Sequence, residues 1–295
     1  MRAKTIRWVG LLSVLAMSLI NGLFILVDYD RYIGFLSRVL SPDGLIAQPA
    51  IAIIRVYCAF LVLAIFIVIV TTKSVVESFR LLAKSSKLNK AGYLVTAIVI
   101  SSYTFCILFS PRLRDALYRE DCFFENLTAV CAILSSIVML ICINKGDGRA
   151  VMAIKLILAI LYFLFCMEET SWGQRIFGWN TPDSFAKLNS QHETNIHNLY
   201  TRLNPLLYCL FNFVLGVFLL NLEWIRKKIQ SFLRIARYAY LLPPQEFRLY
   251  GLVFLALSAQ SLYFILGGEL TEEVFSVFGL AYALDQLVIA KTRLQ

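Results

Sequence analysis

Charged residues and histidines are scarce in this chain. Lysine, arginine, aspartate and glutamate make up 16% of the 295 residues, whereas 59% are hydrophobic. An ordinary soluble domain is roughly 25% charged, so the composition excludes that class. The sequence holds 2 histidines, which excludes a lipid hydrolase site built from three histidines of one chain. Its 7 cysteines form no C-x-x-C pair, so neither a zinc cluster nor a disulfide framework is predicted.

Long apolar runs are abundant instead, and they predict an all-α polytopic membrane helix bundle. A helix needs about 20 apolar residues to cross a hydrocarbon core of ~30 Å. Backbone groups in lipid must be bonded within their own segment, which favours helices over open strands. Residues 1–295 are therefore predicted to form a single integral membrane domain. The eight predicted spans are 8–27, 50–70, 92–110, 122–143, 151–167, 205–222, 249–266 and 271–289.

The positions of the basic residues predict the orientation of this bundle. Lysine and arginine collect in the loops of a membrane protein that face the cytoplasm. When the N-terminus is placed inside, most of the 28 lysines and arginines fall in inner segments. The prediction is a membrane protein with both its N-terminus and its C-terminus on the cytoplasmic side. The net charge of +9 is then a topology signal and does not favour nucleic acid, because the bases are spread over every inner loop.

One inner segment, residues 223–248, mixes basic with apolar residues. It carries Arg226, Lys227 and Lys228 ahead of further arginines among leucine, isoleucine and tyrosine. This pattern is typical of an amphipathic helix lying on anionic lipid headgroups, and equally of a plain inner loop. Membrane lipids are therefore the predicted partners. Lys155, inside the fifth run, is expected to extend its amine to the inner membrane surface.

The outer segment 168–203 contains most of the candidate site. Glu168 and Glu169 end the fifth run, at a helix C-terminus where the helix dipole disfavours an acid. Both histidines of the chain, His192 and His197, follow in the same segment. His192-Glu193-x-x-x-His197 is one residue longer than the H-E-x-x-H of zinc proteases, which excludes that motif.

The same segment carries signals of local order. Thr181, Pro182 and Asp183 have the pattern of a helix start, with threonine as the cap and proline in the first turn. A short helix is expected to run to Leu188, where Asn189 can take a left-handed cap. The segment is therefore predicted to be a structured cap on the extracytoplasmic face.

Further acids open two other spans on the same face. Asp121 and Glu125 are four residues apart at the fourth span, and Glu269, Glu272 and Glu273 share a helix face at the eighth. An ionisable group inside a span costs about 2.5–3.5 kcal/mol, so it usually faces a partner or a water-filled cavity. The alternative is that these acids are solvated among the lipid headgroups.

These patterns assign candidate roles. Glu168 and Glu169 are expected to be the general acid/base pair or metal ligands, and Glu193 and His197 would share a helix face if their segment were helical. The catalytic candidates are Glu168, Glu169, His197, Asp121 and Glu125. The substrate-binding candidates are Trp172, Gln174, Arg175, Asn198 and Arg55. The candidate ligands of a divalent metal are Glu169, His197 and Glu193. The supporting acids are Glu269, Glu272 and Glu273.

Three motifs resemble a family of uncharacterised multipass bacterial inner-membrane proteins. They are REDxxxExLTA at 119–129, EExSWGQRIFGxxTP at 168–182 and ExNxHN at 193–198. The family pattern has isoleucine in place of Thr170 and glycine in place of His192, which gives His197 more weight than His192. The resemblance covers the chain from the fourth span to the start of the sixth, with acids opening the last span. The resemblance implies a location in a bacterial inner membrane, and it implies no activity.

Three functions are compatible with the sequence. The leading hypothesis is a membrane enzyme that hydrolyses or transfers a lipid or lipid-linked envelope substrate, because carboxylates at a water–lipid boundary suit acid–base or metal-assisted chemistry. The alternative is a proton- or cation-coupled transporter that uses intramembrane acids as a relay. The acids gather at one face and not at the midplane, which weighs against transport. The third is a non-catalytic assembly protein whose cap binds another protein.

Overall fold

The computed structural model describes residues 73–109, 111–118, 122–144, 146–189, 192–196, 198, 204–232, 236–261 and 267–292. Helices and turns make up these residues, and no strand occurs among them, so the helical class is confirmed for the described part of the chain. The predicted spans at 8–27 and 50–70 lie outside the described residues.

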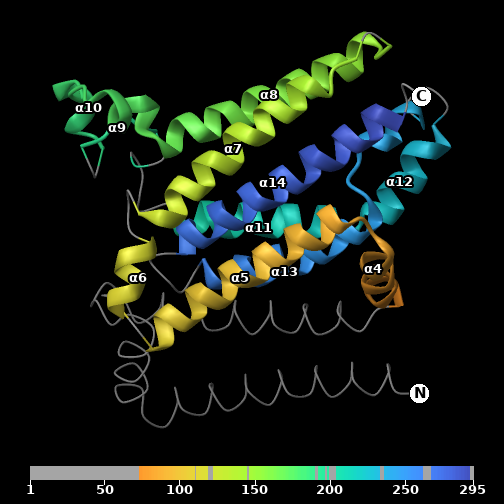
Figure 1. The fold of residues 1–295 in the computed structure, drawn as a ribbon, viewed down its shortest axis with the longest axis horizontal. Helices are drawn as coiled ribbons and strands as arrows, with labels where there is room; N and C mark the ends of the chain where they lie inside the picture. Colours follow the sequence, from red (N-terminus) through yellow and green to blue (C-terminus); the bar gives the residue numbers. More distant parts are fainter. Residues whose placement is uncertain are drawn as a thin grey trace, which may run out of the picture. The chain divides into compact units, whose positions relative to one another are not determined.

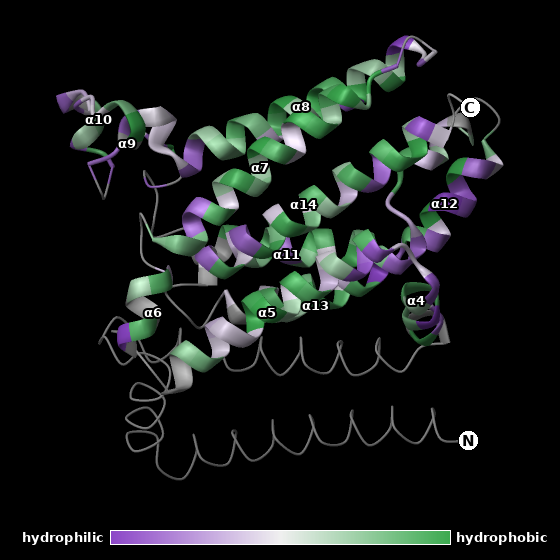
Figure 2. Cartoon of the chain, viewed as in Figure 1, coloured by the Kyte–Doolittle hydropathy of each residue, from purple (hydrophilic) through white to green (hydrophobic). Residues whose placement is uncertain are grey.

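Three of the described helices are long and apolar enough to cross a membrane (Figure 1). A fourth candidate is a helix pair, α11 and α12, that bends by 62° at the break between them. Figure 2 shows the apolar colouring continuing along most of α8 and giving way to polar residues at its ends. The three long helices are α7 (Phe123–Ile141), α8 (Arg149–Glu169) and α14 (Gly267–Thr292), and the pair is α11 (Asn204–Leu220) and α12 (Leu222–Ser231).

These helices coincide with the fourth, fifth, eighth and sixth predicted spans. Two more helices, α5 and α13, coincide with the third and seventh, whereas the count of eight spans stays a prediction. The other helices are short or polar. The bounds are α4 (Lys73–Lys84), α5 (Lys87–Phe109), α6 (Pro111–Tyr118), α9 (Gln174–Phe177), α10 (Asp183–Ala186), α13 (Arg248–Gln260) and the 3₁₀ turns η1 (Ser171–Gly173), η2 (Ala236–Leu241) and η3 (Gln245–Phe247).

The chain divides into two compact units, and α7, α8 and α14 belong to the same one. The hydroxyl of Ser136 on α7 donates to the carbonyl of Ala159 on α8 at 2.8 Å. Gly279 of α14 lies so close to Tyr162 of α8 that a Cβ there would come within 2.6 Å of the ring. Small residues allow helices in lipid to approach closely and gain van der Waals contact. The three helices are therefore joined by packing and by a polar contact.

The turn between α7 and α8 holds an ion pair that corrects one expectation. The side chain of Lys155 is 3% exposed. Its amine donates to Asp147 at 2.6 Å and to the carbonyl of Cys142. Lys155 therefore does not extend to the membrane surface, because a carboxylate and a carbonyl of the preceding turn bind its amine inside the protein.

The other unit includes α4, α11 and α13. Gly216 of α11 and Gly251 of α13 face each other, and a Cβ on Gly251 would lie 2.9 Å from the carbonyl of Gly216. The amide of Asn212 donates to the hydroxyl of Ser261 at 3.1 Å. Close backbone approach and a polar contact thus join α11 to α13, as in the unit that contains α14.

Candidate functional site

Segment 168–203, the predicted cap, begins at the end of α8 with a turn of unusual backbone conformation. Ser171 and Trp172 have positive φ values of 47° and 57°, and Gly173 follows at 84°. Positive φ is uncommon for residues with a side chain, so it persists only where surrounding contacts hold it. The contacts that hold this turn come from the acids of the predicted site.

Glu168 joins the end of α8 to the far part of the cap. One carboxylate oxygen accepts the indole N–H of Trp172 at 2.7 Å, and the other accepts the backbone N–H of Ile196 at 2.7 Å. Hydrogen bonds to a charged group contribute about 1.5–3 kcal/mol each. Glu168 therefore fixes the cap through both of its oxygens.

Glu193 makes a second connection within the cap. Its carboxylate accepts the hydroxyl of Ser171 at 2.7 Å and the amide of Asn195 at 2.8 Å. Asn195 is 1% exposed and also receives the amide of Asn189 on its side-chain oxygen at 2.8 Å. The sequence segments around Glu168 and Glu193, far apart in the chain, thus meet through Ser171 and Asn195.

The condition under which Glu193 and His197 would share a helix face is not met over the described part of that segment. Residues 192–196 form bends and no helix. His192 takes the left-handed conformation, with φ 58°, and its Nδ1 lies 2.8 Å from the carbonyl of Ala186. Hydrogen bonds to Glu168 and Asn189 draw this segment into an irregular path and outweigh any local helical preference.

The short helix of the cap is also held differently from the prediction. Pro182 occupies the cap position of α10, with no side-chain hydrogen bond to the helix. Thr181 instead donates its hydroxyl to the side-chain oxygen of Gln174 at 3.1 Å, and the same oxygen accepts the N–H of Thr194 at 2.9 Å. Asn189 is not among the residues with positive φ. Long-range contacts have replaced the local caps that the sequence suggested.

The remaining predicted residues are only partly placed. Glu169 and Asn198 are buried, at 4% and 5% exposed, and Glu125 lies half-buried in the first turn of α7. The backbone of Arg175 belongs to α9. His197, Asp121 and Arg55 lie outside the described residues.

The metal site stays a prediction for the same reason. Within the described ranges, no three side chains of histidine, cysteine, aspartate or glutamate come close enough together to hold a metal ion. The predicted set combines Glu169 and Glu193 with His197, which is outside those ranges.

The supporting acid Glu273 is the most deeply placed of the acids that open α14. Its side chain is 3% exposed, and its Oε2 atom has no hydrogen-bond partner among the residues that the structure describes. Glu269 and Glu272 are half-buried on the same helix and lie close enough to repel a charge on Glu273. Glu273 thus lies buried on α14, a helix that is long and apolar enough to cross a membrane.

Helix α7 runs beside this part of α14 in the same direction (Figure 1). Cys131 lies beside Ser276, and further along Cys142 lies 3.9 Å from the carbonyl of Ala283. One helical turn before Cys131, Thr128 is at the level of Glu273. The hydroxyl of Thr128 is also buried and has no hydrogen-bond partner within the described part of the chain.

Tyr118, at the end of α6, lies within electrostatic range of Glu273. It is 1% exposed, and its ring stacks on Phe124 with centroids 4.3 Å apart. Its hydroxyl is hydrogen-bonded to that of Ser102 and donates to the carbonyl of Val99 at 3.2 Å. Tyr118 of α6 and Thr128 of α7 therefore lie near the buried acid of α14, and Ser102 of α5 is hydrogen-bonded to Tyr118.

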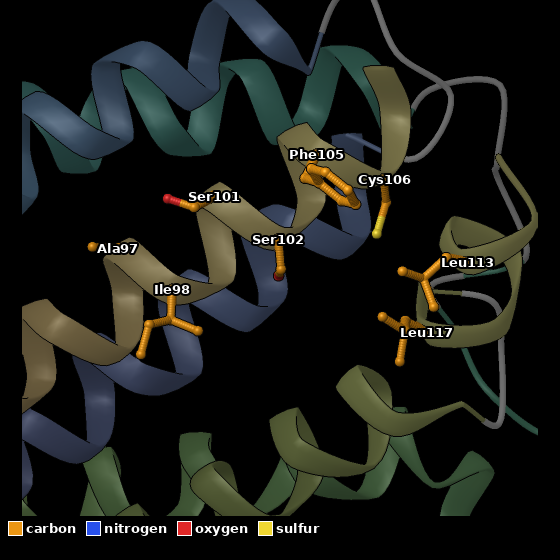
Figure 3. A pocket seen from close by; sticks show the side chains of 8 residues that line it. All are labelled: Ala97, Ile98, Ser101, Ser102, Phe105, Cys106, Leu113 and Leu117. Carbon is orange, nitrogen blue, oxygen red and sulfur yellow. The ribbon is translucent and has the colours of Figure 1, made fainter. Parts of the chain in front are cut away.

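An apolar pocket adjoins the hydroxyl pair of Ser102 and Tyr118. Figure 3 shows Leu113 and Leu117 of α6 reaching toward α5, with Ser102 in the opposite wall. The volume of the pocket is about 460 Å³, within the range of small-molecule sites. Its lining residues are Ala97, Ile98, Ser101, Ser102, Phe105, Cys106, Leu113 and Leu117.

Sequence reasoning missed Ser102, Tyr118 and Thr128. Hydroxyl-bearing residues are common in and beside the apolar runs of this chain, and nothing in the local pattern distinguishes these three. Comparison of the chain with protein-family models, with curated proteins and with solved structures gives no match. An account of function must therefore rest on the chemistry of the site.

Proposed function

We propose that this chain is a proton-coupled transporter of a bacterial inner membrane and that Glu273 is its proton carrier. The observation that carries the proposal is the burial of this carboxyl, 3% exposed, on a helix long enough to span a membrane. In the proposed topology both termini are inside, the chain crosses the membrane eight times, and the cap over residues 168–203 is on the extracytoplasmic side.

The described surroundings of Glu273 contain acids and hydroxyls. Burial disfavours the charged form of a carboxyl, and so do like charges nearby. Among the described residues, the ionisable groups that interact with it are Glu269, Glu272 and Tyr118, none of which is a cation. Cys131 of α7 is the further titratable group one turn along, beside Ser276. The proton can leave when water or a cationic group reaches the site in a second conformation.

The sequence weighs against transport because its acids gather at one membrane face. The position of Glu273 along α14 weakens that objection. It lies five residues into the span that begins at Gly268, about 8 Å along the helix. It is thus buried between helices more than one turn from the start of α14, whereas Glu168 and Glu193 use their oxygens for hydrogen bonds within segment 168–203. In this proposal Glu168 and Glu193 hold the cap in shape, and the cap covers the outer end of the proton pathway.

A second candidate function is the lipid-processing enzyme that the sequence favours. The apolar pocket between α5 and α6 supports it, because a hydrocarbon chain suits that lining and the hydroxyl of Ser102, which is hydrogen-bonded to that of Tyr118, lies at its wall. In this case Glu169, buried in the cap at 4% exposed, would be the acid or base. The two candidates differ in which glutamate is essential.

Transport currents across a solid-supported membrane separate the candidates. The full chain would be reconstituted and exposed to amino acids, nucleosides, quaternary amines and lysolipids under an imposed pH gradient. We expect a current with at least one of these classes that follows the gradient, is lost in Glu273→Gln and persists in Glu272→Gln. The second variant removes the same charge from the adjacent, half-buried position.

Wild-type currents in Glu273→Gln would contradict the proposal. A new lipid product in the same liposomes, lost in Glu169→Gln and kept in Glu273→Gln, would establish the enzyme in its place.

A further inference from the structure

One face of α12 combines an exposed aromatic residue with exposed lysines. Trp224 on α12 is 61% exposed, and so is Phe232, which directly follows the last residue of the helix. Lys227 and Lys228 lie between them on the same face and are also exposed. Figure 2 shows α12 as largely hydrophilic, in contrast to α8. Tryptophan beside lysine is the composition that membrane–water interfaces favour.

Arg226, which precedes the two lysines, is not directed outward but binds backbone carbonyls of the protein. Arg226 donates to the carbonyls of Ala239 and Pro243 at 2.8 Å and to that of Leu242 at 3.2 Å. These three carbonyls belong to the segment that follows α12. Because Arg226 is directed to them, the neighbouring Lys227 and Lys228 are presented on the exposed side.

The start of α12 is fixed as well. Arg248 is 7% exposed and donates to the carbonyl of Leu220 at 3.1 Å and to Glu223 at 3.2 Å. The axis of the helix is bent by 62° from that of α11. A helix that leaves a span at such an angle can lie along the membrane surface.

We propose that the face formed by Trp224, Lys227, Lys228 and Phe232 binds the headgroups of anionic phospholipids. Charge complementarity identifies this occupant, since two lysine amines meet phosphate oxygens while the indole and phenyl rings enter the interface. The two arginine contacts hold the face in place before lipid binds, so little ordering accompanies binding. This inference is independent of the proposed function of Glu273.

Lipid binding to the full chain in detergent tests the proposal. Phosphatidylglycerol would be titrated against phosphatidylcholine, and bound lipids counted by native mass spectrometry. Each lysine near a membrane surface strengthens binding to anionic lipid by about fivefold, so K227Q/K228Q should weaken phosphatidylglycerol binding roughly 20- to 30-fold. The matched control is K87Q/K90Q, which removes two exposed lysines from α5 and should weaken the binding less, because no exposed tryptophan is their neighbour in the sequence.

Equal loss in the two double variants would overturn the proposal, since it would assign the binding to general positive charge. An unchanged affinity in K227Q/K228Q would overturn it too. Quenching of tryptophan fluorescence by brominated phosphatidylglycerol gives a second measurement. The quenching should fall in W224F and not in W179F, and quenching that W224F leaves intact would place the α12 face away from lipid.

Discussion

Replacing Glu168 with alanine should release the cap segment 192–196 from the end of α8. The carboxylate accepts two hydrogen bonds of 2.7 Å, from Trp172 and from Ile196. Each contributes about 1.5–3 kcal/mol, and water can replace part of both because Glu168 is half-buried. A loss of about 3 kcal/mol corresponds to amide exchange about 100-fold faster at Ile196, since ~1.4 kcal/mol is a factor of ten.

Hydrogen–deuterium exchange of the purified chain measures this effect directly. Peptides covering 192–196 should exchange faster in Glu168→Ala, whereas peptides from α14 should not change. Asp183→Asn is the matched control, because Asp183 is an exposed acid of the same cap. Unchanged exchange at Ile196, or an equal rise in α14, would refute the conclusion that Glu168 fixes the cap locally.

Two further substitutions test the packing of the helices around α14. Lys155→Met should lower the free energy of unfolding by about 3–5 kcal/mol, because it removes the ammonium that neutralises the carboxylate of Asp147, whose side chain is 8% exposed. Thermal unfolding in detergent measures it, and a wild-type midpoint would mean that the ion pair contributes nothing. Gly279→Ala should cost about 1–3 kcal/mol, since its Cβ would lie 2.6 Å from Tyr162. Gly146→Ala is the control, with no neighbour within 4 Å, and equal effects would refute the close approach.

The sequence was sufficient to predict the helices but not their polar contacts. A run of apolar residues determines a membrane helix by its length alone, which is why α7, α8 and α14 coincide with predicted spans. The ion pair of Lys155 depends on the path of a turn. A long amine inside an apolar run gives no sign of whether a carboxylate or water will meet it.

The cap shows the same limit at longer range. Its many helix-start and turn residues predicted that the segment is locally ordered. Hydrogen bonds of Glu168 and of Ser171 with Glu193 connect its described residues. Their partners could not be predicted, because Glu168 binds Ile196 across 28 residues and the positive φ of Trp172 decides that path. Thr181 was predicted to cap the short helix, but its hydroxyl binds Gln174, a partner that only the folded segment brings close.

The acids of α14 were predicted as a group and could not be ranked. Glu269, Glu272 and Glu273 share one helix face by their spacing, so periodicity treats them alike. Burial distinguishes them, and it depends on how α14 rotates against its neighbours. Only Glu273 is fully buried among the three. The sequence pattern therefore could not single out Glu273, the proposed proton carrier, from the other two acids.

The protonation state of Glu273 is the most direct test of the proposed function. Infrared difference spectra of the full chain in lipid, recorded across pH, resolve the carbonyl stretch of a protonated carboxyl. We expect this band at neutral pH in the wild type and in Glu272→Gln, and its loss in Glu273→Gln. A band that is the same in the wild type and in Glu273→Gln would show that Glu273 is ionised, and would contradict its role as a proton carrier.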